Sequence, residues 1–222
     1  MRGRLTFLSA SGQTCGFNPA FVEQVSWEPR VFVHSHFLSD EECEEIIQIG
    51  NATGLERSAV AGEDGQPKES EFRTSYGAFL PRKAAVLKRI EERIAEWTQI
   101  PAENGEPFYL LRYQNGQQYV PHYDFFDPEM PGMSAFLGTP GQRTATVLLY
   151  LATPIKGGET IFTNTDIKVP AIKGTAVLFY SHTPDHQLDR TSTHGGLPVE
   201  EGTKYCCTKW IRENSWYPDI DD

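Results

Sequence analysis

The pattern of apolar positions in the first part of the chain predicts a strand followed by a helix. Residues 30–38 are rich in β-branched and aromatic side chains, as is typical of a strand. Ser39 follows, and Glu42 stands three residues later, so the two can form a capping box at a helix N-terminus. Ile46 and Ile47 give this helix an apolar side, and the glycines at 50 and 54 end it.

A second helix is predicted after a loop and a short strand. Residues 62–71 are rich in Gly, Glu and Lys, as in an exposed loop, and 73–80 are compatible with a strand. Between 82 and 99, apolar side chains recur at helical spacing with charged residues between them: Ala85, Leu87, Ile90, Ile94 and Trp97. The N-terminal part therefore supplies two amphipathic helices.

Short β-rich runs separated by turn residues fill the rest of the chain. The runs are 108–113, 119–125, 144–151, 159–162, 176–180 and 204–212. Turn pairs such as Asn115-Gly116 and Gly157-Gly158 separate them. Many short strands after two helices predict an α+β fold that is mainly β. We expect a double-stranded β-helix (jelly-roll) core, with N-terminal helices buttressing one face and a cavity between facing strands.

The length and the cysteines are those of one ordinary folded domain. The 222 residues suit a lead-in at 1–28, a domain at 29–216 and a C-terminal tail at 217–222. The four cysteines show no CxxC spacing, which argues against structural zinc and against a disulfide framework. If 204–212 is a strand, adjacent Cys206 and Cys207 point to opposite faces.

The net charge and the N-terminal residues bear on which binding partners and which cellular location we expect. The formal charge of −10 argues against general nucleic-acid binding, which needs Lys and Arg to neutralise phosphates. The basic start has too short an apolar stretch for a convincing signal peptide, and no run of about 18 apolar residues exists. We expect a cytoplasmic protein with no nucleic-acid or membrane partner, and the oligomeric state stays open.

A candidate metal site begins with His122 and Asp124 in a β-rich run. Residues i and i+2 of a strand face the same way, so the imidazole and the carboxylate can share one metal ion. A firm site needs a third ligand from elsewhere in the chain. Taken alone, this His-x-Asp pair is weak evidence.

The other histidines differ in their suitability as the third ligand. His34 and His36 belong to the N-terminal strand, which we expect outside the roll, and His182 and His186 lie in a turn. His194 stands just before Gly195-Gly196 and a β-rich terminal run, so it is the preferred partner. Two histidines and one carboxylate on one face are the ligands of non-haem Fe(II) oxygenases.

Lys204 stands ten residues after His194, in the last β-rich run. If its side chain points inward, it places a cation inside a largely apolar roll, where an unpaired charge is costly. A dicarboxylate co-substrate would supply the missing anion. An exposed strand lysine is the alternative.

Much of the chain resembles the prolyl 4-hydroxylase branch of the 2-oxoglutarate oxygenases. The similar stretches are LRY at 111–113, QQYVPHYD at 117–124, TATVLLYL at 144–151, GGETIF at 157–162, KG at 173–174, HGG at 194–196, PV at 198–199, Gly202, Lys204 and TKWI at 208–211. Upstream, SDEEC at 39–43 and RTS at 73–75 are also similar. The resemblance covers about 31–212, and many motifs in the right order make it specific.

The resemblance implies a role for each matching position. It implies that His122, Asp124 and His194 bind iron and that Lys204 pairs with the distal carboxylate of 2-oxoglutarate. Two further positions match residues that hydrogen-bond this co-substrate, and four match residues that line the peptide groove. The co-substrate positions are Tyr113 and Thr160, and the groove positions are Arg73, Ser75, Arg143 and Trp210.

The function implied is hydroxylation of prolyl residues at the 4-position in peptides or proteins. The reaction would use Fe(II), 2-oxoglutarate and O₂, give succinate and CO₂, and draw on ascorbate to restore Fe(II); residues 29–216 would be the catalytic domain. Two alternatives stay open. One is a hydroxylase of a free amino acid or another small molecule, and the other is a non-catalytic jelly-roll module that senses a metal or ligand.

One residue departs from the family pattern, and two Gly-rich segments are particular to this chain. Arg212 replaces a frequent histidine, which puts the end of the peptide groove in question. The segments 62–71 and 127–142 combine Gly with polar or Pro residues. We expect both to border the cavity and to act as lids that become ordered when a peptide binds.

Overall fold

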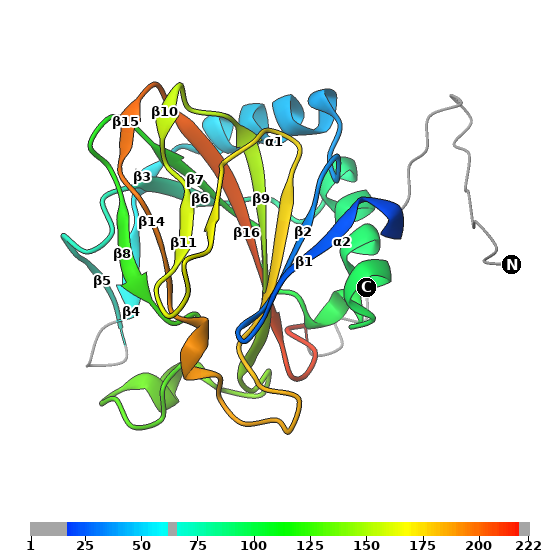
Figure 1. The fold of residues 1–222 in the computed structure, drawn as a ribbon, viewed down its shortest axis with the longest axis vertical. Coiled ribbons are helices and arrows are strands. Elements are labelled where there is room, and N and C mark those ends of the chain that lie inside the picture. The colour runs from blue at the N-terminus through cyan, green and yellow to red at the C-terminus, as the bar shows by residue number, and fades with distance from the viewer. Residues whose placement is uncertain (1–16, 62–65, 218–222) are drawn as a thin grey trace, which may run out of the picture.

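The computed structural model describes residues 17–61 and 66–217, in which two β-sheets face each other (Figure 1). The major sheet has the strand order β1 (Val22–Trp27), β2 (Arg30–His34), β13 (Ala176–Tyr180), β9 (Arg143–Ala152), β16 (Lys204–Arg212), β7 (Tyr109–Tyr113), β6 (Tyr76–Phe79) and β3 (Glu56–Arg57). The minor sheet has the order β12 (Lys168–Val169), β11 (Thr160–Phe162), β14 (His194–Gly196) and β8 (Tyr119–His122). Two further sheets have two strands each: β10 (Lys156–Gly157) with β15 (Val199–Glu201), and β4 (Ala59–Ala61) with β5 (Pro67–Glu69). The predicted jelly-roll class is confirmed.

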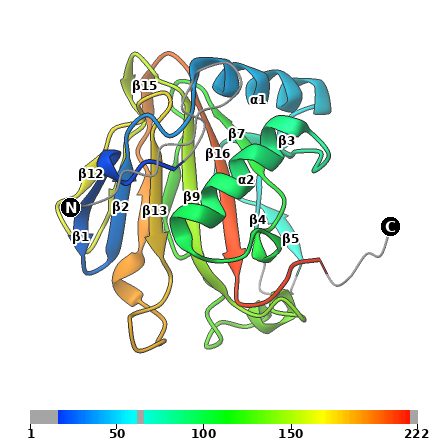
Figure 2. The same ribbon diagram turned by 90° about the vertical axis from the view of Figure 1, so that its right-hand side faces the viewer.

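Two helices cover the outer face of the major sheet, as Figure 2 shows. They are α1 (Asp40–Thr53) and α2 (Ala85–Thr98). The predicted capping box is present, since Ser39 Oγ accepts from the Glu42 N–H and the Glu42 carboxylate accepts from the Ser39 N–H. Glu42 also pairs with Arg93 of α2 through two hydrogen bonds of 2.9 and 3.0 Å, so one carboxylate both caps α1 and ties it to α2.

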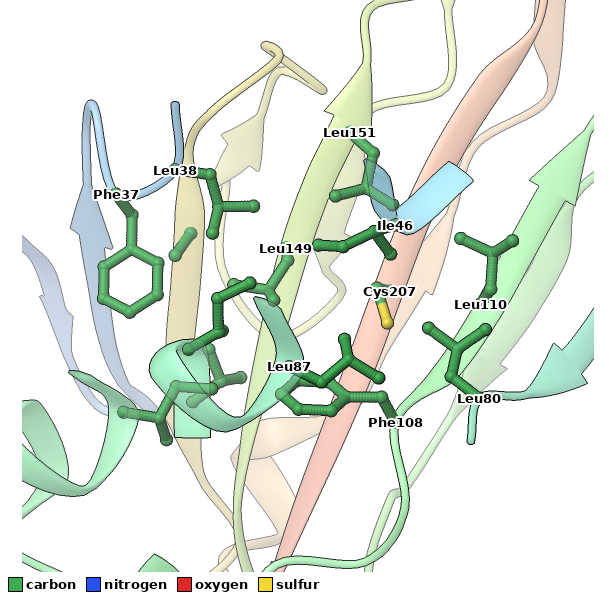
Figure 3. Packing of buried hydrophobic residues seen from close by; sticks show 14 of the residues in the cluster. Phe37, Leu38, Ile46, Leu80, Leu87, Phe108, Leu110, Leu149, Leu151 and Cys207 are labelled. Carbon is green, nitrogen blue, oxygen red and sulfur yellow. The ribbon is translucent and has the colours of Figure 1, made fainter. Parts of the chain in front are cut away.

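The apolar core is divided by the major sheet into two clusters. The outer cluster lies between the sheet and the helices and includes Ile46, Leu87, Leu149 and Cys207 (Figure 3). The inner cluster lies between the two sheets and includes Cys206. Cys206 and Cys207 thus occupy opposite faces of β16, as predicted. The same alternation decides which other side chains of β16 can reach the interior of the roll.

The N-terminal strands belong to the major sheet, which corrects one expectation. β2 pairs with β13 as well as with β1, so the strand that ends at His34 is part of the roll, although the His34 ring lies against Trp97 of α2 on the outer face. β1 falls within 1–28, the range given as a lead-in, and extends the sheet by one edge strand. Only one side chain of β1, Val25, packs against the inner cluster, so the run carries little of the apolar alternation that marks a strand.

His34 is a buried titratable group whose surroundings favour the neutral form. It is 2 % exposed and lies against the rings of Phe37 and Trp97 at 5.1 and 5.6 Å. Its Nδ1 is 2.8 Å from the carbonyl oxygen of Ser35, whereas Nε2 is buried without a hydrogen-bond partner. Burial, followed by smaller effects that include the charge of Arg93, lowers the pKa of His34 below its usual 6.5.

We therefore predict that His34 makes the fold less stable in mild acid. Because the pKa of His34 is lower in the folded state, the unfolded chain takes up the proton first. The stability is present above about pH 6.5 and is lost as the pH falls from there through the folded-state pKa. Chemical unfolding at several pH values should show a smaller acid loss for His34→Asn than for the wild type. The exposed His36 provides the control, and an equal acid loss in His34→Asn and His36→Asn would contradict the prediction.

Among the described residues, none of the helices combines the length and the apolar character that crossing a membrane requires.

Candidate metal centre and co-substrate cavity

Pairing in the minor sheet brings the candidate metal ligands together. His122 is the last residue of β8, and His194 is the first residue of β14. These two residues are register partners in the antiparallel ladder, so the sheet itself sets the third ligand opposite the first. Asp124 follows just after the end of β8 rather than within the strand. One ligand atom from each of the three residues lies within 4.8 Å of the others.

Backbone hydrogen bonds orient both imidazoles toward the carboxylate. Nδ1 of His122 is 2.9 Å from the oxygen of Val120, and Nδ1 of His194 is 3.0 Å from the oxygen of Ser192. In the tautomer that carries the proton on Nδ1, each ring donates to its carbonyl and keeps the Nε2 lone pair free. Those Nε2 atoms each lie 3.6 Å from an oxygen of Asp124. Histidines that bind metal ions typically donate a hydrogen bond in this way from the ring nitrogen that does not bind the metal.

The electrostatics of the group suit a divalent cation. Burial by itself would raise the pKa of Asp124, but the neighbouring His194 and His122 hold it well below its usual range. Burial lowers the pKa of His194 to about 4. An ionised carboxylate and a neutral imidazole are the forms that bind metal ions. Thr146 Oγ1 donates to Asp124 Oδ2 at 2.6 Å, which fixes the carboxylate from the major sheet.

Aromatic rings enclose the group. Tyr119 stacks on His122 with 3.6 Å between ring centroids, and Phe179 lies 4.3 Å from the ring of His194. Sequence reasoning missed these rings and Thr146, although Tyr119 and Thr146 fall within motifs that carry the resemblance. Strand alternation could not have signalled the Tyr119 ring, because a residue three positions before His122 faces the other way in a regular strand, and here the register shifts between the two residues.

Lys204 is a buried cation in the same cavity, without a carboxylate partner. It is 3 % exposed, and its Nζ donates to the carbonyl oxygen of Gly158 at 2.7 Å. The rings of Tyr113 and Tyr150 lie 5.3 and 5.4 Å from Nζ. No carboxylate of the described residues is within ion-pairing distance, and burial lowers the pKa of Lys204. The alternative of an exposed lysine is therefore wrong. The side chain points inward, and a buried ammonium is costly unless an anion pairs with it.

Hydroxyl groups line the path between Lys204 and the metal group. Tyr113 and Thr160 both face the cavity, as do His122, Asp124, His194 and Lys204. Burial raises the pKa of Tyr113, so its hydroxyl is neutral and able to donate. Tyr150, which sequence reasoning missed, donates to Thr160 Oγ1 at 2.7 Å. The two functional ends thus share one cavity lined by hydrogen-bonding groups.

Comparison with known proteins identifies the family. Residues 108–212 match the model of the 2OG-Fe(II) oxygenase superfamily. The chain is 41 % identical to "Probable prolyl 4-hydroxylase 7" of Arabidopsis thaliana over 96 % of this chain and 72 % of that protein. It is also 39 % identical to "Prolyl 4-hydroxylase 5" of the same plant, over 91 % and 75 % of the two chains. The chain belongs to the prolyl 4-hydroxylase family of the 2OG-Fe(II) oxygenases.

A solved structure of the family supports the same relation. The viral collagen prolyl hydroxylase of Paramecium Bursaria Chlorella virus-1, in complex with 2OG, superposes with a TM-score of 0.65 and 30 % identity. The match covers 82 % of this chain and 95 % of that one. As a 2OG-Fe(II) oxygenase of the prolyl 4-hydroxylase family, the protein uses Fe(II) and 2-oxoglutarate. The donor atoms of the two histidines and the aspartate fit the metal, as do the ionised carboxylate of Asp124 and the neutral imidazole of His194, and buried Lys204 fits a dicarboxylate.

The predicted groove residues of this prolyl 4-hydroxylase family member fall into two pairs. Arg73 and Trp210 line the cavity beside the metal group. Arg73 is 5 % exposed and lies over the rings of Tyr109 and Tyr119 at 5.2 and 4.7 Å. Nε of Arg73 and Nε1 of Trp210 are both buried without a hydrogen-bond partner. Two donors are therefore available to an acceptor that enters the cavity.

Ser75 and Arg143 do not line that cavity. Ser75 is fully buried and donates to Ser58 Oγ at 3.1 Å. Arg143 forms two hydrogen bonds with Glu106, of 2.7 and 2.9 Å, and its guanidinium lies 3.9 Å above the Trp210 ring. Arg143 therefore packs on the Trp210 ring, while Ser75 belongs to the buried interior next to Ser58.

Arg212, the departure noted in the sequence, is only 1 % exposed. It pairs with Glu106 and donates to the carbonyl oxygens of Phe136 and Leu137, both at 2.7 Å. These two carbonyls belong to the predicted lid at 127–142, so the buried Arg212 side chain holds that segment through two hydrogen bonds. The other predicted lid, 62–71, lies partly outside the described residues.

Proposed function

We propose that this protein hydroxylates prolyl residues at the 4-position in peptides or proteins, with 2-oxoglutarate and O₂ as co-substrates and succinate and CO₂ as products. The observation that carries the proposal is a single cavity with His122, Asp124 and His194 at one end and unpaired Lys204 at the other. A metal ligand set and a buried cation in one cavity match a co-substrate with a chelating end and a distal carboxylate. A module that only senses a metal or a ligand would not require both a metal ligand set and a buried cation in the same cavity.

Within this proposal, each residue of the cavity has one task. His122, Asp124 and His194 hold Fe(II), which when bound supplies the redox chemistry of oxygen activation. Lys204 pairs with the distal carboxylate of 2-oxoglutarate, and Tyr113 donates a hydrogen bond to it. Thr160, held by Tyr150, accepts or donates at the same end. The enclosing rings exclude water and keep the co-substrate in one orientation.

Two unpartnered donors favour a peptide over a free amino acid. A prolyl residue in a peptide has no N–H, so its backbone offers only carbonyl acceptors. Arg73 Nε and Trp210 Nε1 are donors of the matching kind, and leaving them unpaired in a buried site is costly. The carboxylate of free proline could also accept from these donors, but its charged amine would find no carboxylate among the described cavity-lining residues except the proposed metal ligand Asp124. The small-molecule alternative is therefore the less favoured one.

A panel of substrates tests the proposal. Pro-containing peptides, free proline and other free amino acids are each incubated with protein, Fe(II), 2-oxoglutarate and ascorbate, and hydroxylated product is measured by mass spectrometry. We expect product from peptides alone. Product from free proline but not from peptides would replace the proposal with the small-molecule alternative, and 2-oxoglutarate that is never consumed would favour the sensor module.

Trp210→Phe should weaken peptide capture without affecting the co-substrate. The substitution keeps an aromatic ring under Arg143 and removes the Nε1 donor together with the five-membered ring that carries it. Loss of one hydrogen bond, worth about 0.5–1.5 kcal/mol, should raise the KM for peptide roughly two- to tenfold. The affinity for 2-oxoglutarate serves as the internal control and should stay unchanged. An unaltered KM for peptide would show that Trp210 Nε1 does not bind the peptide.

We further propose that residues 29–216 are the catalytic domain, extended by β1 at the sheet edge. O₂ and a proline-containing peptide or protein are the partners in this proposal, and ascorbate is the reductant that keeps the iron as Fe(II). The cytoplasmic location and the lack of nucleic-acid and membrane partners stay predictions.

A further inference from the structure

One ion pair joins the two segments of chain that carry the candidate metal ligands. Arg190 lies four residues before His194, and Asp127 lies three residues after Asp124. Arg190 forms hydrogen bonds of 2.6 and 3.2 Å with the two oxygens of Asp127. A further bond of 2.9 Å reaches Glu129. Figure 1 shows this orange turn beside the green loop at the foot of the minor sheet.

The turn that holds Arg190 also orients the imidazole of His194. It is a single 3-10 turn, Arg190–Ser192, which the buried Asp189 caps by accepting from Thr191 N at 2.9 Å. Ser192 is 2 % exposed, and its carbonyl oxygen is the acceptor of the 3.0 Å bond to Nδ1 of His194. The position of this turn therefore sets the direction in which Nε2 of His194 points.

Asp127 is the fixed side of the pair. Its side chain is 7 % exposed, whereas that of Arg190 is 47 % exposed. The preceding residue, Phe126, is clamped by Gln142, which accepts from Phe126 N at 2.8 Å and donates to Phe126 O at 2.7 Å. Asp127 thus sits on backbone that is anchored independently of Arg190.

Strand pairing holds His194 to Phe162 of β11 and to His122 of β8, but it does not reach Asp124, which follows the end of β8. β14 has three residues, and its pairing with β8 is interrupted between His194 and Gly196. On the N-terminal side of His194, Asn164 donates to two carbonyl oxygens of the turn, whereas Arg190 is the turn residue that reaches the segment after Asp124, at Asp127 and Glu129. A ligand at the first residue of a short, irregular strand needs a second attachment to keep a fixed distance from Asp124.

We propose that Arg190 is a positioning residue for the metal centre. Its ion pair with Asp127 holds the turn that orients His194 at a set distance from Asp124, and this raises the affinity for Fe(II). The inference rests on the proposed function, because it takes His122, Asp124 and His194 as the ligands. Residues that orient metal ligands commonly contribute ten- to a hundredfold, roughly, to metal affinity.

Anaerobic Fe(II) affinity, measured by competition with a chromophoric chelator, tests this directly. Arg190→Ala and Asp127→Asn should each bind Fe(II) about tenfold more weakly than the wild type. The double variant should lose no more than either single one, because the two residues act as one pair. Glu129→Gln is the matched control: its carboxylate is 80 % exposed and contacts the same guanidinium, so its affinity should stay within about twofold.

Two further readouts separate positioning from general stability. Thermal unfolding of the metal-free variants establishes that they are folded, and Arg190→Lys should recover part of the Fe(II) affinity. Unchanged Fe(II) affinity in folded Arg190→Ala, or an equal loss in Glu129→Gln, would overturn the inference. A wild-type chain that binds no Fe(II) would contradict the proposed function, and the inference with it.

Discussion

Replacing His122, Asp124 or His194 with Ala should abolish turnover of 2-oxoglutarate, by at least about a hundredfold, while the protein stays folded. Each residue provides one of three ligands, and a cation held by two ligands is lost or misplaced. The fold should persist because the three side chains face a cavity rather than the apolar core. Succinate formation and anaerobic Fe(II) binding are the measurements.

His186→Ala is the control for this set. His186 is exposed in the turn at 182–188 and does not line the cavity, so its loss should leave succinate formation unchanged. Near-normal activity in any one of the three alanine variants would show that the residue concerned is not a ligand. Loss of Fe(II) binding together with loss of the unfolding transition would instead show that the residue is needed for folding.

Lys204→Met should weaken 2-oxoglutarate binding about ten- to a hundredfold. The substitution keeps an apolar stem and removes the cation, and a charge-assisted bond in a buried site is worth about 1.5–3 kcal/mol. The metal-free protein should be as stable as the wild type or more so, because an unpaired buried ammonium is removed. Titration of 2-oxoglutarate into the anaerobic Fe(II)-loaded protein measures the affinity, and denaturant unfolding measures the stability.

Lys209→Met is a matched control on the same strand. Lys209 is 2 % exposed but lies on the opposite face of β16, where it pairs with Glu91 of α2. Its loss breaks a buried ion pair and should cost about 3–5 kcal/mol of unfolding free energy with no change in 2-oxoglutarate affinity. The two lysines thus have opposite expected profiles. Unchanged 2-oxoglutarate binding in Lys204→Met would rule out Lys204 as the carboxylate partner.

Some of this site could be read from the sequence because the signals are local. The i, i+2 spacing of His122 and Asp124 indicates a shared direction, and the turn pairs and β-rich runs indicate a roll. The capping box at Ser39 and Glu42 needs only four residues, and the structure confirms it. The family motifs then added the order of the remaining positions, including Lys204.

The rest depends on contacts that no local pattern encodes. Arg190 and Asp127 are 63 residues apart, and neither lies in a motif that would draw attention to it. Strand β1 shows weak apolar alternation, so the sequence does not distinguish it from a lead-in, and its pairing with β2 is what identifies it as a strand. Arg212 could be recognised as a departure from the family, but its burial against Glu106 and two loop carbonyls follows only from the folded chain.

The central claim is that one cavity couples 2-oxoglutarate consumption to hydroxylation of a prolyl residue in a peptide. The most direct test incubates the protein with Fe(II), 2-oxoglutarate, O₂ and a Pro-containing peptide, and measures succinate and peptidyl 4-hydroxyproline together. We expect the two products to form in equal amounts, and both to disappear when Fe(II) is removed with a chelator. Succinate formed at the same rate without any hydroxylated peptide, across a panel of Pro-containing sequences, would contradict it.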